Sequence, residues 1–187
     1  MRVSLLQHRT LKHLQGDAMI IEPRYIYGAI FVGLGATLVM DLWALIMRRV
    51  FNIALPNYCF VGRWLCYMPA GIFVHTNIAT AAKKSAECAA GWITHYFVGV
   101  VYALLLVIPT SGRWLDQPTL LPALLVGIAT VVMPYFIMQP SFGLGIAAAK
   151  TPKPTQARLK SLMAHASFGV GLYLAGYVLS QVIRVFT

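Results

Sequence analysis

Four apolar runs, each long enough to cross a bilayer as a helix, decide what this chain can fold into. They cover about residues 25–47, 89–109, 119–139 and 161–183. A hydrocarbon core roughly 30 Å thick takes about 20 residues of helix. The mean hydropathy of +0.71 and the 59% of hydrophobic residues lie outside the usual range of soluble domains. We therefore expect an all-α integral membrane protein, a bundle of four transmembrane helices without a separate soluble catalytic domain.

The basic residues lie between and beside these runs, so they indicate topology rather than a nucleic-acid partner, despite a net charge of +10. Two connections are basic, residues 48–88 and 148–160, and the positive-inside rule places both in the cytoplasm. Arg113 and Arg184 are the only basic residues in the second connection and after the fourth run, which suits the outer side.

The amino terminus conflicts with this topology. Arg2, Arg9 and Lys12 would draw that end to the cytoplasm as well. Two explanations stay open: translation starts at Met19, or residues 1–18 form a cytoplasmic or amphipathic surface tail. In either case residues 19–187 are expected to form one membrane domain.

The connection between the first two runs is too long to be a simple turn. Residues 60–78 mix aromatic, apolar and polar side chains, and Pro69 and Gly71 interrupt them, so the segment is expected to be interfacial or re-entrant. Cys59, Cys66 and Cys88 form no CxxC pair. An odd count on the predicted cytoplasmic side favours free thiols over a disulfide framework.

Proline residues punctuate the third run. Pro122, Pro134 and Pro140 lie in or directly after it, and Gly143 and Gly145 follow. Proline removes a backbone donor and clashes with the preceding turn, so we expect a kink and an unwound end there.

Polar residues inside the runs are the chemical clue. Asp41 is the only formally charged residue within any run, and His95, His165 and Gln139 lie in or at the end of the other three. Counted from the nearest basic connection at 1.5 Å per residue, Asp41, His95 and His165 fall within roughly 7 to 17 Å of the same membrane face. We expect the four side chains to form one inward-facing cluster.

Small residues at helical spacing indicate which helix faces pack together. Stripes of this kind let membrane helices approach closely, and they are expected to face the bundle interior. A second stripe on the fourth run is expected to be available to another helix or to a second copy of the protein. The inward set is Gly33, Thr37, Gly99, Ala103 and Gly169, and the second stripe is Ser167, Gly171 and Ala175.

Three functions stay open for the polar cluster. It could bind a proton or a small solute during transport, or it could only hydrogen-bond the helices together in a structural or accessory protein. In the alternative, His95 and His165 are axial ligands of a b-type haem in a membrane redox subunit. No common catalytic or metal-binding motif occurs, so we expect a non-enzymatic membrane component without a metal, partnered by the lipid bilayer and open to self-association.

Taken together, the motifs resemble those of an uncharacterised bacterial inner-membrane family, domain of unknown function 2938, over about residues 25 to 180. The resemblance implies a four-helix, multi-pass protein of the bacterial plasma membrane and supplies no activity. It rests on Gly35-Ala36-Thr37, Met40-Asp41-Leu42-Trp43, Gly62-Arg63-Trp64, Gly91-Trp92, His95-Tyr96, Pro118-Thr119-Leu120-Leu121-Pro122-Ala123, Gln139-Pro140, Gly143, Gly145, His165, Phe168-Gly169 and Gly171-Leu172-Tyr173.

Overall fold

All regular structure in the described part of the chain is helical. The computed structural model describes residues 22–186, and the expectations about residues 1–18 and a start at Met19 lie outside that range. Four helical segments are long and apolar enough to cross a membrane: Pro23–Phe51, Glu87–Val107, Leu120–Ser141 and Pro154–Val185. The all-helical class and the four long apolar helices predicted from the sequence are confirmed.

Helix α2 (Pro23–Phe51) is the central element of the bundle. Pro23 starts it at a position where no backbone donor is needed, and Asn52 ends it in the left-handed conformation with its N–H on the Met47 carbonyl. One side of α2 contacts α4 (Glu87–Val107) and another contacts α8 (Pro154–Phe186). Its remaining face exposes large apolar side chains, as expected of a surface that meets lipid.

The third apolar segment is broken where the prolines predicted it. Helix α6 (Leu120–Ala129) ends before Thr130, whose hydroxyl donates to the Gly127 carbonyl. Pro134 then opens a π-helical turn, η2 (Pro134–Met138), and a last turn, α7 (Gln139–Ser141), follows. Since proline cannot donate to the preceding turn, the chain changes helical pitch there instead of continuing α6.

The connection between α2 and α4 contains a helix of its own, α3 (Tyr58–Tyr67), followed by the short turn η1 (Met68–Ala70). The Asn57 side chain caps α3 by accepting from the Cys59 N–H. Gly62 and Gly91 let α3 lie directly on the start of α4, because a Cβ at either position would collide with the other helix's backbone.

A buried ion pair fixes the connection that follows α3. The Arg63 guanidinium donates to both carboxylate oxygens of Glu87, at 2.8 and 2.6 Å. It also donates to the carbonyls of Ile78, Ala79 and Ala81. From the sequence, Arg63 was only one residue of the basic connection and of the Gly62-Arg63-Trp64 motif. In the structure it is the centre of a hydrogen-bond network.

The cysteine expectation was wrong. Cys59 and Cys88, predicted to be free thiols, form a disulfide bond, and Cys66 is the unpaired one. The pairing follows from the packing of α3 on α4, which places Cys59 beside the second residue of α4. A sequence separation of 29 residues gave no indication of this contact.

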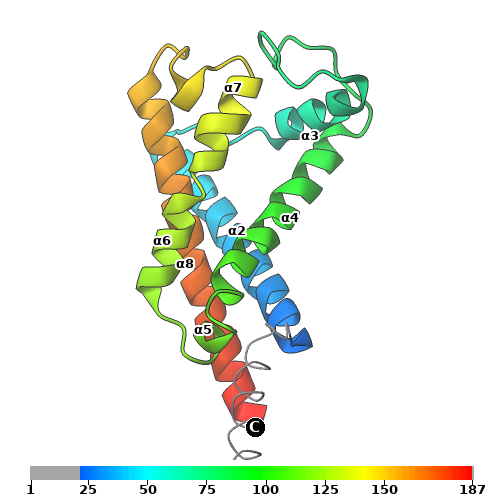
Figure 1. The fold of residues 1–187 in the computed structure, drawn as a ribbon. Coiled ribbons are helices and arrows are strands. Elements are labelled where there is room, and N and C mark those ends of the chain that lie inside the picture. The colour runs from blue at the N-terminus through cyan, green and yellow to red at the C-terminus, as the bar shows by residue number, and fades with distance from the viewer. Residues whose placement is uncertain (1–21, 187) are drawn as a thin grey trace, which may run out of the picture.

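The helices form two arms that diverge toward one end of the molecule (Figure 1). One arm is α4 with α3 lying on its end, and the other is α8 with α6 and α7. The short helix α5 (Arg113–Asp116) lies at the opposite end. At the divergent end the connection after α3 bridges the arms, since His75 and Ile78 donate backbone hydrogen bonds to the Ser141 and Phe142 carbonyls.

Candidate functional site

Asp41 lies on α2, and three side chains from α3 and α4 contact its carboxyl group. His95 Nε2 lies 3.0 Å from Oδ1, and the Tyr96 hydroxyl donates to Oδ2 at 3.0 Å. The Tyr58 hydroxyl also donates to Oδ1, at 3.3 Å. The Asp41 side chain is 18% exposed, so these hydrogen bonds replace most of the water that a carboxylate would hold.

Tyr58 brings α3 into this site. Its ring stacks on the His95 imidazole with a centroid separation of 3.9 Å, and its edge contacts Trp92. Burial, together with the nearby Asp41 carboxylate, raises the pKa of the Tyr58 hydroxyl, so it stays protonated and remains a donor. Sequence reasoning missed Tyr58, because it lies outside the apolar runs, and it named Tyr96 only as part of the His95-Tyr96 motif.

Two further polar pairs lie on the opposite arm. His165 Nδ1 lies 2.7 Å from the Thr130 hydroxyl, which itself donates to the Gly127 carbonyl at the broken end of α6. Gln139 Nε2 donates to the Ser161 hydroxyl at 3.2 Å. Gln139 is only 6% exposed, and its Oε1 has no hydrogen-bond partner among the described residues. A buried acceptor left in this state costs about 1–3 kcal/mol.

A cavity of about 440 Å³ lies between the arms. One face of α4 lines it with His95, and one face of α8 lines it with His165 and Ser161. Gln139 contributes from the broken third segment. The volume is within the range of small-molecule sites, roughly 300–1,000 Å³. The divergence of the arms therefore produces a space of ligand size at the level of the polar residues.

The four residues predicted to form one cluster are divided by the structure into two groups. Asp41 and His95 are in direct contact. His165 and Gln139 belong to the other arm, and they share the cavity with His95. Asp41 is not on the cavity wall; it lies behind His95 and Tyr58, both of which are. The site is therefore a cavity with a carboxylate held behind one of its walls.

The small residues lie at the contacts between helices. Gly33 and Thr37 of α2 meet Gly99 of α4, where a Cβ would reach the Thr37 hydroxyl, and Ala103 is fully buried one turn further on. Gly169 of α8 lies against α6. The helices approach so closely at these points that larger side chains have no room.

The second stripe on α8 is not an open surface. A Cβ at Gly171 would lie 2.8 Å from the Cα of Ala36, and Ala175 lies against Gly35, so both residues pack on α2 of the same chain. Of the two partners expected for this stripe, the one found at Gly171 and Ala175 is another helix, α2. The reason is that α8 crosses α2 along this stripe, whereas Gly169 faces α6 on another side.

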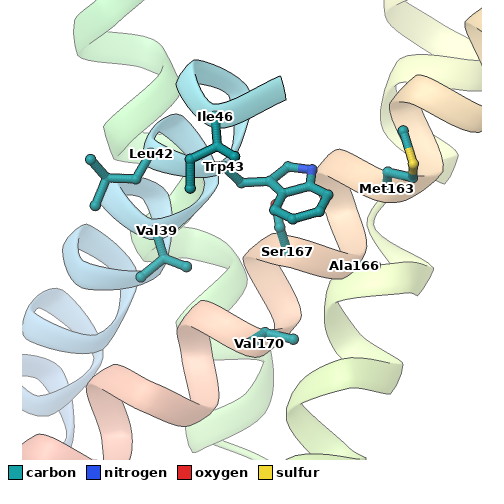
Figure 2. A pocket seen from close by; sticks show the side chains of 8 residues that line it. All are labelled: Val39, Leu42, Trp43, Ile46, Met163, Ala166, Ser167 and Val170. Carbon is teal, nitrogen blue, oxygen red and sulfur yellow. The ribbon is translucent and has the colours of Figure 1, made fainter. Parts of the chain in front are cut away.

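Ser167, the third member of that stripe, lines a shallow groove between α2 and α8 (Figure 2). Its hydroxyl donates to the Ala164 carbonyl, and every other group that lines the groove is apolar or aromatic. The groove therefore offers a surface for hydrocarbon rather than a polar site. It is lined by Val39, Leu42, Trp43, Ile46, Met163, Ala166, Ser167 and Val170.

The two histidines do not present a matched pair of ligands for haem iron. His165 places Nδ1 against the Thr130 hydroxyl, but His95 turns its Nε2 toward Asp41 at 3.0 Å. Axial coordination through both Nε2 atoms would require the contact with Asp41 to break first. Within residues 22–186 no group of three His, Cys, Asp or Glu side chains is placed to hold a metal ion. Haem binding by His95 and His165 stays a prediction.

Comparison with known proteins places the chain in a family without assigning it a role. A family model described as "Protein of unknown function (DUF2938)" matches residues 30–179. No curated protein and no solved structure matches the chain. The matched range includes all four predicted site residues as well as Tyr58 and Arg63. Because it covers most of the 187 residues, the chain belongs to the DUF2938 family of proteins of unknown function.

Proposed function

We propose that this protein is a multi-pass membrane protein that binds a small solute in the cavity between its arms and moves it together with a proton. The four long helices span the plasma membrane of a bacterium, and the end that carries α3 and α7 faces the cytoplasm. The proposed role involves no enzymatic reaction, in keeping with the absence of a common catalytic motif in the sequence.

The observation that carries the proposal is the placement of Asp41. An ionisable residue at membrane depth is costly unless it is paired, and such residues commonly mark ion or proton pathways. Asp41 is hydrogen-bonded to His95, and His95 lines a cavity of about 440 Å³. A proton exchanged between Asp41 and His95 would change the charge of the cavity wall, which gives a physical route for coupling a solute to a proton.

A flux measurement tests this function. The purified protein would be reconstituted in liposomes that contain a pH-sensitive dye, and proton entry would be followed after a membrane potential is imposed. We expect wild-type flux above that of empty liposomes, and Asp41→Asn should lower it to the liposome background, because asparagine keeps the shape but does not exchange a proton. Asp116→Asn is the matched control, since Asp116 is the exposed last residue of α5.

Wild-type liposomes that leak no faster than empty ones would rule out proton movement by the isolated protein. Full flux in Asp41→Asn would show that the carboxylate is not the exchanging group. In either case the same hydrogen bonds would support the structural alternative, because Asp41 ties α2 to α3 through Tyr58 and to α4 through His95.

The redox alternative is tested separately by a reduced-minus-oxidised visible spectrum of the purified protein. A haem band that disappears in both His95→Ala and His165→Ala would support it. A colourless preparation from cells supplied with haem would remove it.

A further inference from the structure

The formally charged side chain among the described residues that line the cavity is basic. Among the described residues that line it there is no aspartate or glutamate, because Asp41 is screened by His95 and Tyr58. Lys160 lines the cavity and is exposed at the cytoplasmic end of α8, where no described carboxylate pairs with its ammonium group. A negative group on a ligand is therefore favoured and a positive one is disfavoured.

One turn of α8 and the last turn of the third segment provide a hydrogen-bonding pair beside Lys160. Within the described part of the chain, Gln139 Oε1 is a buried acceptor without a partner. Ser161 accepts from Gln139 Nε2, and its own hydroxyl hydrogen has no acceptor among the described residues. The pair thus offers one acceptor and one donor side by side. A carboxyl group matches this arrangement, since its protonated form donates through O–H and accepts through C=O.

The rest of the cavity wall is mainly apolar, with His95 and His165 as its ionisable groups. Met40, Val98, Met133 and Phe168 line it there, on four different segments. Apolar walls bind apolar ligand surface, and methionine side chains adapt to irregular shapes. The cavity is therefore polar near Lys160 and mainly apolar elsewhere, and a ligand that fills it must have the same division.

We infer that the cavity binds a small monocarboxylic acid with an apolar body, its carboxyl group at Gln139, Ser161 and Lys160 and its body among the apolar walls. This inference rests on the proposed function and names its solute class. Lys160 stabilises the carboxylate form near the mouth, and the Gln139–Ser161 pair accommodates the protonated form.

Three eight-carbon probes that differ only in their polar group test the inference: octanoate, octylamine and 1-octanol. Binding to the full-length protein in lipid nanodiscs would be followed by tryptophan fluorescence, because Trp64 lines the cavity, with protein-free nanodiscs as the blank. Octanoate should bind saturably and at least roughly fivefold more tightly than the other two, given the usual strength of hydrogen bonds to charged groups.

Two substitutions locate the carboxyl group. Lys160→Met should weaken octanoate binding roughly tenfold and leave octanol binding unchanged. Gln139→Leu should weaken octanoate binding roughly fivefold. Lys153→Met is the matched control, since Lys153 is exposed before α8 and does not line the cavity. Unchanged octanoate affinity in both Lys160→Met and Gln139→Leu would overturn the inference.

A cavity-filling substitution separates failure of this inference from failure of the proposed function. Ala164 lines the cavity, so Ala164→Phe should abolish binding of any occupant. If octylamine or octanol binds as tightly as octanoate and loses binding in Ala164→Phe, the solute class is wrong and the cavity remains a binding site. If probe binding survives Ala164→Phe, or if none of the three probes binds above the blank, the cavity is not the site and the proposed function fails with the inference.

Discussion

At the scale of single residues, the carboxyl group of Asp41 is held by side chains from two helices, and only one of these helices, α4, lies within a predicted apolar run. His95 and Tyr96 belong to α4, whereas Tyr58 comes from the connection. Hydrogen bonds to charged groups contribute about 1.5–3 kcal/mol each, so Tyr96→Phe should lower the free energy of unfolding by roughly that amount. The measurement is SDS-induced unfolding in mixed micelles, followed by circular dichroism.

Tyr177→Phe is the control for this prediction. Tyr177 lies on α8 and is 49% exposed, and no hydrogen bond of its hydroxyl occurs in the described structure. It should unfold as the wild type does. Equal stability of Tyr96→Phe and Tyr177→Phe would mean that the Tyr96 hydroxyl finds other partners when Asp41 is not its acceptor, and that the arrangement of three side chains around Asp41 contributes little to the fold.

At the scale of elements, the contact between α2 and α8 depends on the absence of a side chain at Gly171. A Cβ there would lie 2.8 Å from the carbonyl oxygen of Ala36 and 2.9 Å from the Cβ of Val39. Gly171→Leu should therefore separate the two helices and destabilise the protein by roughly 2–4 kcal/mol, in the range of severe overpacking. Thermal unfolding in detergent would measure the loss.

The adjacent residue provides the comparison. Val170 borders the open groove between α2 and α8, and Val170→Leu adds volume where there is space for it (Figure 2). This variant should melt within a few degrees of the wild type. Similar losses in both variants would indicate that α8 tolerates no added bulk on either side, and the specific role of Gly171 would be withdrawn.

The attachment of α3 depends on the Arg63–Glu87 pair. Glu87→Met leaves the Arg63 charge buried without its partner, which typically costs about 3–5 kcal/mol. Arg63→Met with Glu87→Met removes both charges, so the double variant should recover part of that loss. The stability should be recovered only in part, because Arg63 also donates hydrogen bonds to the carbonyls of Ile78, Ala79 and Ala81. Additive losses in a double-mutant cycle would contradict this coupling.

Periodicity and length were sufficient to predict the helical elements, but not the contacts that form between them. Apolar runs and prolines indicated four long helices and the break at Pro134, because these are local properties of the chain. The charged residue at depth led directly to Asp41 and its contact with His95. Tyr58 and the Arg63–Glu87 pair could not be predicted, since they depend on how α3 folds back over α4.

At the scale of the whole molecule, two indicators of orientation disagree. The basic connections 48–88 and 148–160 predict that the α3 end faces the cytoplasm. The Cys59–Cys88 bond lies at that end, and disulfides are rare in a reducing compartment. Arg63 is paired with Glu87, so its charge does not indicate the orientation. Arg48, Arg49 and the lysines before α8 are exposed, and their charges still favour the cytoplasmic side. We therefore retain the cytoplasmic orientation.

The Cys59–Cys88 bond predicts one free thiol per chain, Cys66, and the basic connections predict the side of the membrane on which it lies. Acid-quenched cells, denatured and treated with a maleimide polymer, should show one modified thiol per chain, rising to three after reduction, because Cys66 is the unpaired cysteine. In a cysteine-free background, Gln117→Cys near α5 should react with an impermeant maleimide in intact cells, and Lys153→Cys only after permeabilisation. External labelling of Lys153→Cys in intact cells would reverse the topology. The cavity mouth at Lys160 would then open outward, and its solute would enter from outside the cell.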